Sequence, residues 1–224
     1  MMIGVWHRPS AERESTLEGV IRVIEEFCSA GINTVFLEVF YHGVTFFKNN
    51  MVPYKPEFSD FNYCEYTDYL TAFVGEATKR GVKIHAWVQN FYVGVKEEAQ
   101  FVTEHAAWLL KNQHGMIRHT TEGGGFGGYI FLDPANREVK DFLVEFYNEI
   151  LTRFPEIKGL NLDYIRYPVS IFEEDTDTGY TEPCMRDFAE REGLSDEEIA
   201  SAKLFNATIK EKGLLDICDR KILS

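Results

Sequence analysis

The sequence has few cysteines, and no two of them are close neighbours in sequence. Cys28, Cys64, Cys184 and Cys218 stand far apart and never as CxxC. This pattern excludes the usual zinc ribbons and a dense disulfide framework, so we expect reduced or buried thiols. The glycine-rich run Gly123–Gly128 lacks the Lys-Ser/Thr ending of a phosphate-binding loop, and we interpret it as an ordinary loop.

Basic residues are also scarce. The chain has 23 Lys and Arg against 36 Asp and Glu, which gives a formal net charge of −13. This balance argues against nucleic acid as a partner, because binding to phosphates depends on Lys and Arg that release counterions. A neutral or cationic small molecule fits the charge better.

Long apolar segments are missing as well. No run approaches the roughly 20 apolar residues of a membrane helix, so we predict no membrane partner. The N-terminus MMIGVWHRP lacks the basic, apolar and small-residue parts of a signal peptide. The chain as given is therefore expected to be cytoplasmic, and to be secreted only if its N-terminus was trimmed.

Short strand-like runs alternate with amphipathic helices. Strands are predicted over residues 3–6, 34–41, 82–88 and 159–167, and Gly31 and Gly81 end the helices between the first three. This alternation is typical of βαβ units and a parallel sheet. A (β/α)₈ TIM barrel has eight such strands in about 250 residues, so the chain is expected to hold the N-terminal half, about four βα units.

The length of 224 residues and the hydrophobic content of 45% predict a single domain over residues 1–224. Residues 1–168 would form the barrel strands with their helices, and residues 169–224 an acidic helical segment. Further local signals are an N-cap at Asn136 and a capping box formed by Ser195 and Glu198.

Polar residues interrupt the predicted strands near their carboxyl ends. The interruptions are Glu38 and His42 in the second strand, His85, Trp87 and Gln89 in the third, and Asn161 and Asp163 in the fourth. By the period of two, each set shares one face of its strand. His7 and Arg8, just past the first strand, are expected to join the same rim. In barrel enzymes this end of the sheet carries the active site.

Asp163 is the strongest catalytic candidate, because Tyr164 and Arg166 follow it and offer an aromatic surface and a cation that could tune its pKa. The alternative is a structural carboxylate paired with Arg166 or Arg8. Glu38 lies deeper in its strand, where it is either a second catalytic acid or a supporting core acid. Trp6, Tyr41, Trp87 and Tyr92 form an aromatic group that serves either sugar binding or core packing.

Several stretches resemble the glycosyl-hydrolase-like barrel family related to glycoside hydrolase family 10, a group of bacterial glycosidases. They are NTVFLEVFYHG, GVKIHAW, WLLKNQHG, FLDPANREVKDFL and KGLNLDYIRYP. The resemblance runs from about Ile3 to Pro168 and implies a (β/α)₈ barrel that acts on O-glycosidic bonds. It places Asp163 at the end of the fourth strand, and His85 and Trp87 at the end of the third. Where the family commonly has Asn-Pro, this chain has Gln89 and Asn90.

The resulting hypothesis is a glycoside hydrolase with Asp163 and Glu38 as catalytic candidates. Hydrolysis of a glycosidic bond requires two carboxyl groups, and the second could also lie on a later strand, if the chain is a fragment. In that case the chain alone could be inactive. The residues predicted to contact a carbohydrate substrate are Trp6, His7, Tyr41, His42, His85, Trp87, Gln89, Tyr164 and Arg166.

Two other functions are compatible with the sequence. One is a metal-dependent hydrolase that uses His7, His42, His85 and Asp163, although the first strand has no His-x-His pair. The other is a carbohydrate-binding domain without catalysis. We predict no metal and no cofactor, and we expect the open edges of a half barrel to favour homo-oligomers.

Overall fold

The computed structural model describes residues 1–63, 65–119, 128–168 and 178–200, and also residues 204, 207, 208, 211 and 212. The chain divides into two compact units: unit 1 comprises Met1–Ala106 and Asp141–Arg166, and unit 2 comprises Ala107–Lys140 and Tyr167–Ser224. The sequence assigned residues 107–140 to the barrel, whereas backbone hydrogen bonds from Gly179 and Tyr180 to the Lys111 carbonyl join this stretch to the C-terminal segment. A single domain over residues 1–224 stays a prediction.

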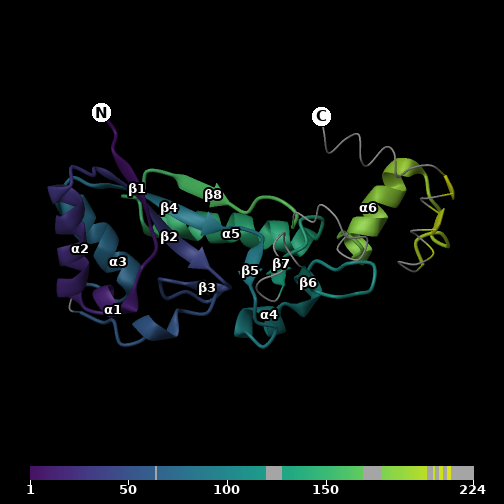
Figure 1. Ribbon diagram of the computed structural model, residues 1–224, viewed down its shortest axis with the longest axis horizontal. Coiled ribbons are helices and arrows are strands. Elements are labelled where there is room, and N and C mark those ends of the chain that lie inside the picture. Colours follow the sequence, from purple (N-terminus) through teal and green to yellow (C-terminus); the bar gives the residue numbers. More distant parts are fainter. Residues whose placement is uncertain are drawn as a thin grey trace. The chain divides into compact units, whose positions relative to one another are not determined.

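Unit 1 is built on a sheet whose main strands are β1 (Gly4–His7), β2 (Thr34–Tyr41), β4 (Lys83–Gln89) and β8 (Leu160–Asp163). The four strands are parallel and lie in the order β1-β2-β4-β8 (Figure 1). A short strand β3 (Val44–Thr45) pairs antiparallel with the end of β2. Parallel strands in sequential order, connected by helices, are half of a (β/α)₈ barrel, which confirms the predicted fold class.

The helices α2 (Leu17–Ser29), α3 (Tyr69–Lys79) and α5 (Arg137–Arg153) connect these strands where the sequence predicts helices. The short helix α1 (Ala11–Glu14), which precedes α2, is not predicted. Thr16 and Asp68 cap the N-termini of α2 and α3 with their side-chain oxygens. Gly31 and Gly81 follow the same two helices with φ of +75° and +74°, a conformation that glycine adopts at little cost.

The core of unit 1 lies between the sheet and the helices. Val35 and Leu37 of β2 and Ile24 of α2 are fully buried. The ring of Phe40 packs on Phe146 of α5, with centroids 5.4 Å apart. Burial of one such side chain contributes about 1.5 to 3 kcal/mol to the stability of the folded chain. The apolar residues that recur periodically in the sequence are the ones that this layer buries.

The fourth strand is shorter than the sequence suggests. It does not continue to Tyr167, because Tyr164 has a φ of +51° and turns the chain directly after Asp163. Between β4 and β8 the chain also forms α4 (Gln100–Glu104) and a 3₁₀ turn at Ala106–Trp108. A further 3₁₀ turn covers Pro56–Phe58.

In unit 2, β6 (Arg118–His119) and β7 (Tyr129–Phe131) pair antiparallel. The side chain of Asn136 accepts a hydrogen bond from the Glu138 N–H at 2.9 Å, which confirms the predicted N-cap. The last described helix of more than one turn is α6 (Glu182–Glu192). Beyond it, Ser195 and Glu198 exchange the two hydrogen bonds of a capping box.

Some predictions fall partly or wholly outside the described residues. They include Cys64, Cys218 and all of the glycine-rich run except Gly128. Cys28 and Cys184 are free thiols.

Among the described residues, β1 and β8 each pair with a strand on one side only, so association through these edges stays a prediction. None of the helices formed by the described residues is long and apolar enough to cross a membrane.

Gly19→Ala is expected to destabilise the protein by about 2 kcal/mol, in urea unfolding. A Cβ atom at Gly19 would lie 2.1 Å from the Arg13 carbonyl oxygen, where α2 packs against α1. Alanine in a helix normally stabilises by about 1 kcal/mol relative to glycine, but overpacking against backbone costs about 1 to 3 kcal/mol and wins here. The exposed neighbour substitution Glu18→Ala is the control and should change the stability by less than about 0.5 kcal/mol. A Gly19→Ala protein as stable as this control would contradict the prediction.

Candidate active site

The strand register arranges the polar residues of unit 1 in layers on one face of the sheet. Glu38 of β2 lies opposite Trp87 of β4, and Trp87 lies opposite Asn161 of β8. One layer nearer the carboxyl ends, Gln89 lies opposite Asp163. Partners in register point to the same side of a sheet, so these side chains share the face opposite the helices. We call this the inner face.

A β-bulge changes the alternation of β2 directly after Glu38. Glu38 pairs with Trp87 and Phe40 pairs with Val88, so β2 advances by two residues where β4 advances by one. Val39 is the extra residue of this bulge. Phe40 therefore points into the helical core, and Tyr41 returns to the inner face, where the Arg8 guanidinium lies 4.1 Å from its ring centre. The prediction that Glu38 and His42 share a face by simple alternation is wrong for this reason.

Glu38 is enclosed by nitrogen donors. Its carboxylate accepts hydrogen bonds from Arg8 Nε at 2.7 Å and Arg8 Nη2 at 3.1 Å, and from Gln89 Nε2 at 3.0 Å. The residue is 0% exposed. Burial raises the pKa of the Glu38 carboxyl above its usual value; Arg8 and Lys55 oppose this rise, and the charge of Asp163 adds to it.

Asp163, at the end of β8, accepts two hydrogen bonds where Glu38 accepts three. Its Oδ2 accepts a hydrogen bond from Trp87 Nε1 at 3.0 Å, and its Oδ1 accepts one from the backbone N–H of Tyr164 at 2.8 Å. Asp163 is partly exposed, unlike Glu38. The guanidinium of Arg166 lies 5.2 Å from the centre of the Tyr164 ring.

Aromatic side chains surround the two carboxylates. The rings of Tyr41 and His42 stack at 3.7 Å, His42 meets Tyr92 of β5 (Tyr92–Gly94) edge-on at 4.9 Å, and Tyr92 packs on Tyr164 at 4.8 Å. On β1, Trp6 is 60% exposed, and its indole N–H donates to Asn161 Oδ1 at 3.1 Å. An exposed indole and a row of rings beside polar groups can bind the apolar faces of a sugar.

His7 does not lie at this site. β1 extends one residue beyond the predicted strand, so His7 alternates with Trp6 and points toward the helices. There its ring stacks on Phe73 at 5.6 Å, and its Nε2 is 2.8 Å from Glu14 Oε2. Glu14 also accepts a hydrogen bond from the buried Tyr69 hydroxyl, at 2.5 Å, which makes this a buried polar contact of the helical layer.

His85 lies on the inner face but one layer deeper than Trp87. It is in register with Phe36, and the two rings are 5.2 Å apart. The structure therefore brings together Glu38, Gln89, Trp87 and Asp163, and it separates His85 from them by a layer. The grouping of His7, His42, His85 and Asp163 that a metal site would need is not formed, and the described residues contain no cluster of three His, Cys, Asp or Glu able to hold a metal ion.

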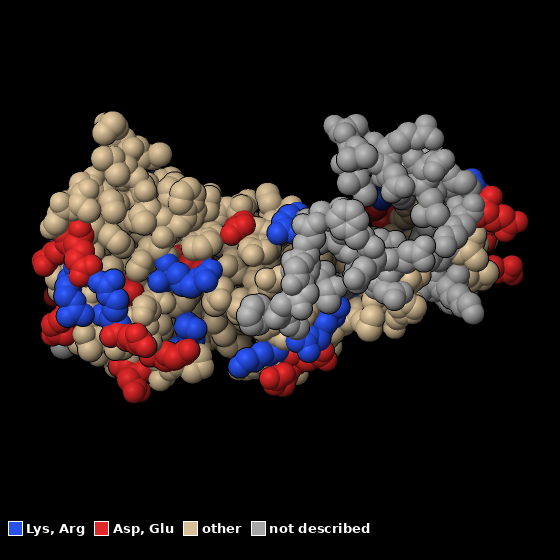
Figure 2. Space-filling model, viewed as in Figure 1, with Lys and Arg blue, Asp and Glu red and all other residues tan. Residues whose placement is uncertain are grey.

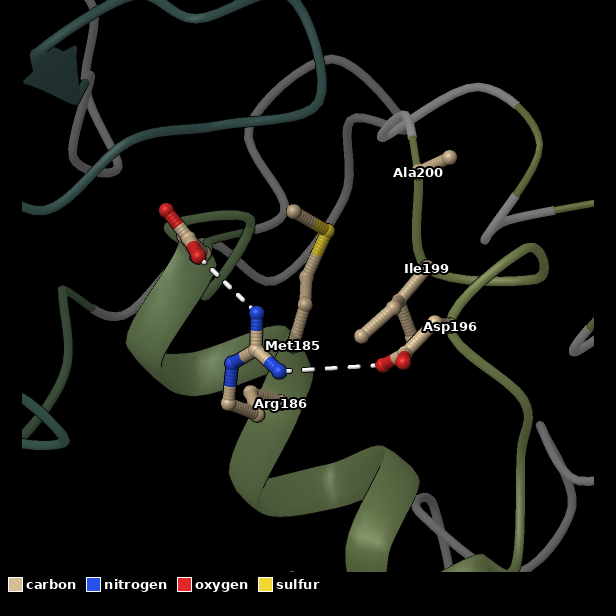
Figure 3. A pocket seen from close by; sticks show the side chains of 6 residues that line it. Met185, Arg186, Asp196, Ile199 and Ala200 are labelled. Carbon is tan, nitrogen blue, oxygen red and sulfur yellow. Dashed lines mark hydrogen bonds and ion pairs between the residues drawn. The ribbon is translucent and has the colours of Figure 1, made fainter.

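Unit 2 has a surface cavity of its own. In unit 2, a hollow of about 350 Å³ is lined by Met185, Ile199 and Ala200 with Glu182, Arg186 and Asp196 (Figure 3). Arg186 lies between the two carboxylates and forms ion pairs with both, at 3.0 and 3.7 Å. These charges satisfy one another at an exposed position. Acidic and basic side chains are likewise interspersed on the face of unit 1 seen in Figure 2.

The arrangement of an aspartate at the carboxyl end of a parallel strand, beside an indole and a buried Arg–Glu pair, agrees with the sequence comparison. The profile of the glycosyl hydrolase-like 10 family matches residues 7–199. The chain belongs to this family. The glycosyl hydrolase-like 10 match covers both units, including all described parts of α6.

Two curated proteins are similar to parts of this chain. Glycosyl hydrolase DigH of Escherichia coli (strain K12) is 26% identical over 165 residues, which cover 72% of this chain and 37% of DigH. The chain therefore matches little more than a third of that curated relative. An S-layer-related protein of Niallia circulans is 27% identical over 106 residues, 45% of this chain and 6% of that protein.

Solved structures resemble the fold of this glycosyl hydrolase-like 10 chain. Alpha-L-fucosidase isoenzyme 2 from Paenibacillus thiaminolyticus superposes with a TM-score of 0.57 and 16% identity, over 92% of this chain and 28% of the fucosidase. A hypothetical protein from Ruminiclostridium thermocellum superposes with a TM-score of 0.51 and 14% identity, over 86% of this chain and 93% of that chain. At such identities the likeness concerns the fold alone.

The stability of the folded protein is expected to depend on pH through the protonation of His42. Burial, and secondarily the charges of Arg8 and Lys55, lower the pKa of His42 from 6.5 to about 4. A depressed histidine pKa contributes stability that is present above the unfolded value and is lost as the pH falls from about 6.5 toward 4. In His42→Asn this contribution is absent, so its melting temperature should fall less than that of the wild type between pH 7 and pH 4. Asparagine tolerates the φ of +53° at this position, and equal pH slopes would refute the prediction.

Proposed function

We propose that this chain carries one catalytic carboxylate of a glycoside hydrolase, Asp163. The observation behind the proposal is the environment of its carboxylate. Asp163 lies at the carboxyl end of a parallel strand, is partly exposed, and is oriented by N–H donors from Trp87 and Tyr164. An accessible carboxylate in a fixed orientation meets the requirement for a nucleophile or general base.

Glu38 has a different part in this proposal. Three N–H donors occupy its carboxylate and no part of it is exposed, so it has little means of reaching a substrate oxygen. We assign it the role of holding Arg8 against Tyr41 and Trp87, with the guanidinium 5.5 Å from the Trp87 ring centre. Because glycoside hydrolysis requires two carboxyl groups, the second is then a residue other than Glu38.

The substrate in this proposal is an oligo- or polysaccharide. Trp6 and the rings of Tyr41, His42 and Tyr164 offer stacking surfaces for pyranose rings, while Arg8, whose side chain is 48% exposed, offers N–H donors for hydroxyls. Gln89 is 2% exposed and donates its Nε2 to Glu38, so it makes no contact with the substrate in this proposal. A second function, carbohydrate binding without turnover, is favoured by one observation. The enclosed Glu38 leaves Asp163 as the one accessible inner-face carboxylate among the layers described above.

The test measures binding and cleavage separately. The purified protein is incubated with a panel of neutral, acidic and amino-sugar oligosaccharides and polysaccharides, and new reducing ends are counted over time. Binding to the same panel is followed by ligand-observed NMR. Cleavage supports the hydrolase, binding without new reducing ends supports the binding domain, and absence of both contradicts both functions.

A further inference from the structure

We propose that Asn90, held from behind by Tyr147, is the positioning residue that sets the orientation of Asp163. Asn90 directly follows β4 and is 0% exposed. Its backbone N–H donates to the Asp163 carbonyl oxygen at 2.9 Å, and its side-chain Nδ2 donates to the same oxygen at 2.6 Å. Two donors from one residue thus converge on the backbone carbonyl of the candidate catalytic aspartate.

The orientation of the Asn90 amide is fixed by its surroundings. Nδ2 faces two carbonyl oxygens, those of Asp163 and, at 3.1 Å, Val88, and a carbonyl can only accept. Oδ1 is therefore the acceptor, and it receives the hydroxyl hydrogen of Tyr147 from α5. Burial raises the pKa of Tyr147 to about 12, so this hydroxyl remains a donor at neutral pH.

The carbonyl that Asn90 holds is the last one of β8. At the next residue the chain turns, because Tyr164 has a φ of +51°. The peptide plane between the two residues determines where the Tyr164 N–H points, and this N–H donates to Asp163 Oδ1 at 2.8 Å. With Oδ1 fixed in this way, Oδ2 reaches Trp87 Nε1 at 3.0 Å. Hydrogen bonds therefore link α5 to Asn90 and Asn90 to the Asp163 carbonyl, and the peptide unit between Asp163 and Tyr164 extends this link to the carboxylate.

Asn90 and Tyr147 act through Asp163 and have no need to touch a substrate. Misplacing a catalytic group by about 1 Å can lower a rate on the order of a hundredfold. Loss of the Tyr147 hydroxyl leaves the buried Asn90 Oδ1 without its donor, and loss of the amide removes one of the two donors on the Asp163 carbonyl. Both changes should therefore move the carboxylate relative to the Trp87 indole. This inference rests on the proposed function only in giving Asp163 the catalytic role.

The test uses the Trp87 indole N–H as a reporter that needs no turnover. The chain has 3 tryptophans, so ¹⁵N-NMR spectra contain few indole signals, and Trp87→Phe identifies the relevant one. At neutral pH this signal should differ between the wild type and Asp163→Asn, because the Trp87 indole N–H donates to Asp163 Oδ2. In Tyr147→Phe and Asn90→Ala the signal should move toward its Asp163→Asn position.

Tyr66→Phe is the matched control, because Tyr66 also donates its hydroxyl to a side chain, Glu76 at 2.7 Å, but outside the hydrogen bonds of Asp163. It should leave the Trp87 signal unchanged. A folded Tyr147→Phe protein whose Trp87 signal matches that of the wild type would overturn the proposal, and this conservative variant decides the matter if Asn90→Ala does not fold. Where cleavage is measurable, kcat should fall about tenfold in Tyr147→Phe with KM unchanged. The NMR response without any cleavage would contradict the proposed function and leave the positioning role supported.

Discussion

Asp163→Asn is expected to lower the rate of glycan cleavage by at least about two orders of magnitude, the lower end of what proton transfer contributes. The substitution keeps the shape of the side chain and removes its charge. One carboxylate oxygen becomes an NH₂ group, which must face either Trp87 Nε1 or the Tyr164 N–H, so one of two hydrogen bonds is lost. We therefore expect a loss of only about 1 kcal/mol in the free energy of unfolding.

Turnover and thermal unfolding are measured on the same preparations, with binding of the cleaved glycan as a third reading. Asp60→Asn, an exposed carboxylate in a loop, is the control for loss of one negative charge, and it should leave all three unchanged. Folded, stable Asp163→Asn protein with turnover near that of the wild type would remove Asp163 from the mechanism. A loss of several kcal/mol with full activity in the folded fraction would make Asp163 a structural residue.

Arg8→Met is expected to be the most destabilising substitution at the site, by about 3 kcal/mol at pH 7. It leaves the fully buried Glu38 without its cation, and breaking a buried ion pair typically costs about 3 to 5 kcal/mol. We expect the lower end of that range, because the Arg8 side chain is 48% exposed and water can replace part of its contribution.

The pH dependence of this variant provides a specific check. The pKa of Glu38 is already raised by burial, and without Arg8 it rises further. A carboxyl with a raised folded pKa is tolerated in its protonated form at low pH and costs stability as the pH rises through that pKa. Urea unfolding should therefore show the Arg8→Met defect shrinking from pH 7 toward pH 4.5. Arg8→Met combined with Glu38→Gln should recover most of the stability at pH 7; a defect that is the same at both pH values would contradict the pairing.

The sequence predicts the framework of unit 1 because the signals for it are local. The apolar run TVFLEVFY predicts β2 at its observed bounds, Thr34–Tyr41, and the stop signal at Gly81 marks the end of the helix before β4. The polar interruptions at Glu38, Trp87 and Asp163 also predict correctly which residues meet on the inner face. These features depend on neighbours in sequence and on the pleat of a strand.

The parts that the sequence does not predict depend on backbone geometry or on distant partners. The bulge at Val39 reverses the alternation of β2, and one additional residue in β1 moves His7 to the helical side. The turn at Tyr164 shortens β8. Asn90 carries no signal of its contact with Asp163, 73 residues away, since a single asparagine after a strand is also typical of an ordinary turn.

The bulge in β2 also affects how this chain should be aligned with proteins that lack it. Val39 is the residue without a partner in β4, so a homologous strand with regular pairing has one residue fewer at this point. An alignment that carries no gap at Val39 would shift every later position of the strand by one. It would then equate Tyr41, beside Arg8, with a residue of the hydrophobic core, and Phe40 with a residue of the inner face. Site residues should therefore be transferred between relatives only after the gap has been placed at position 39.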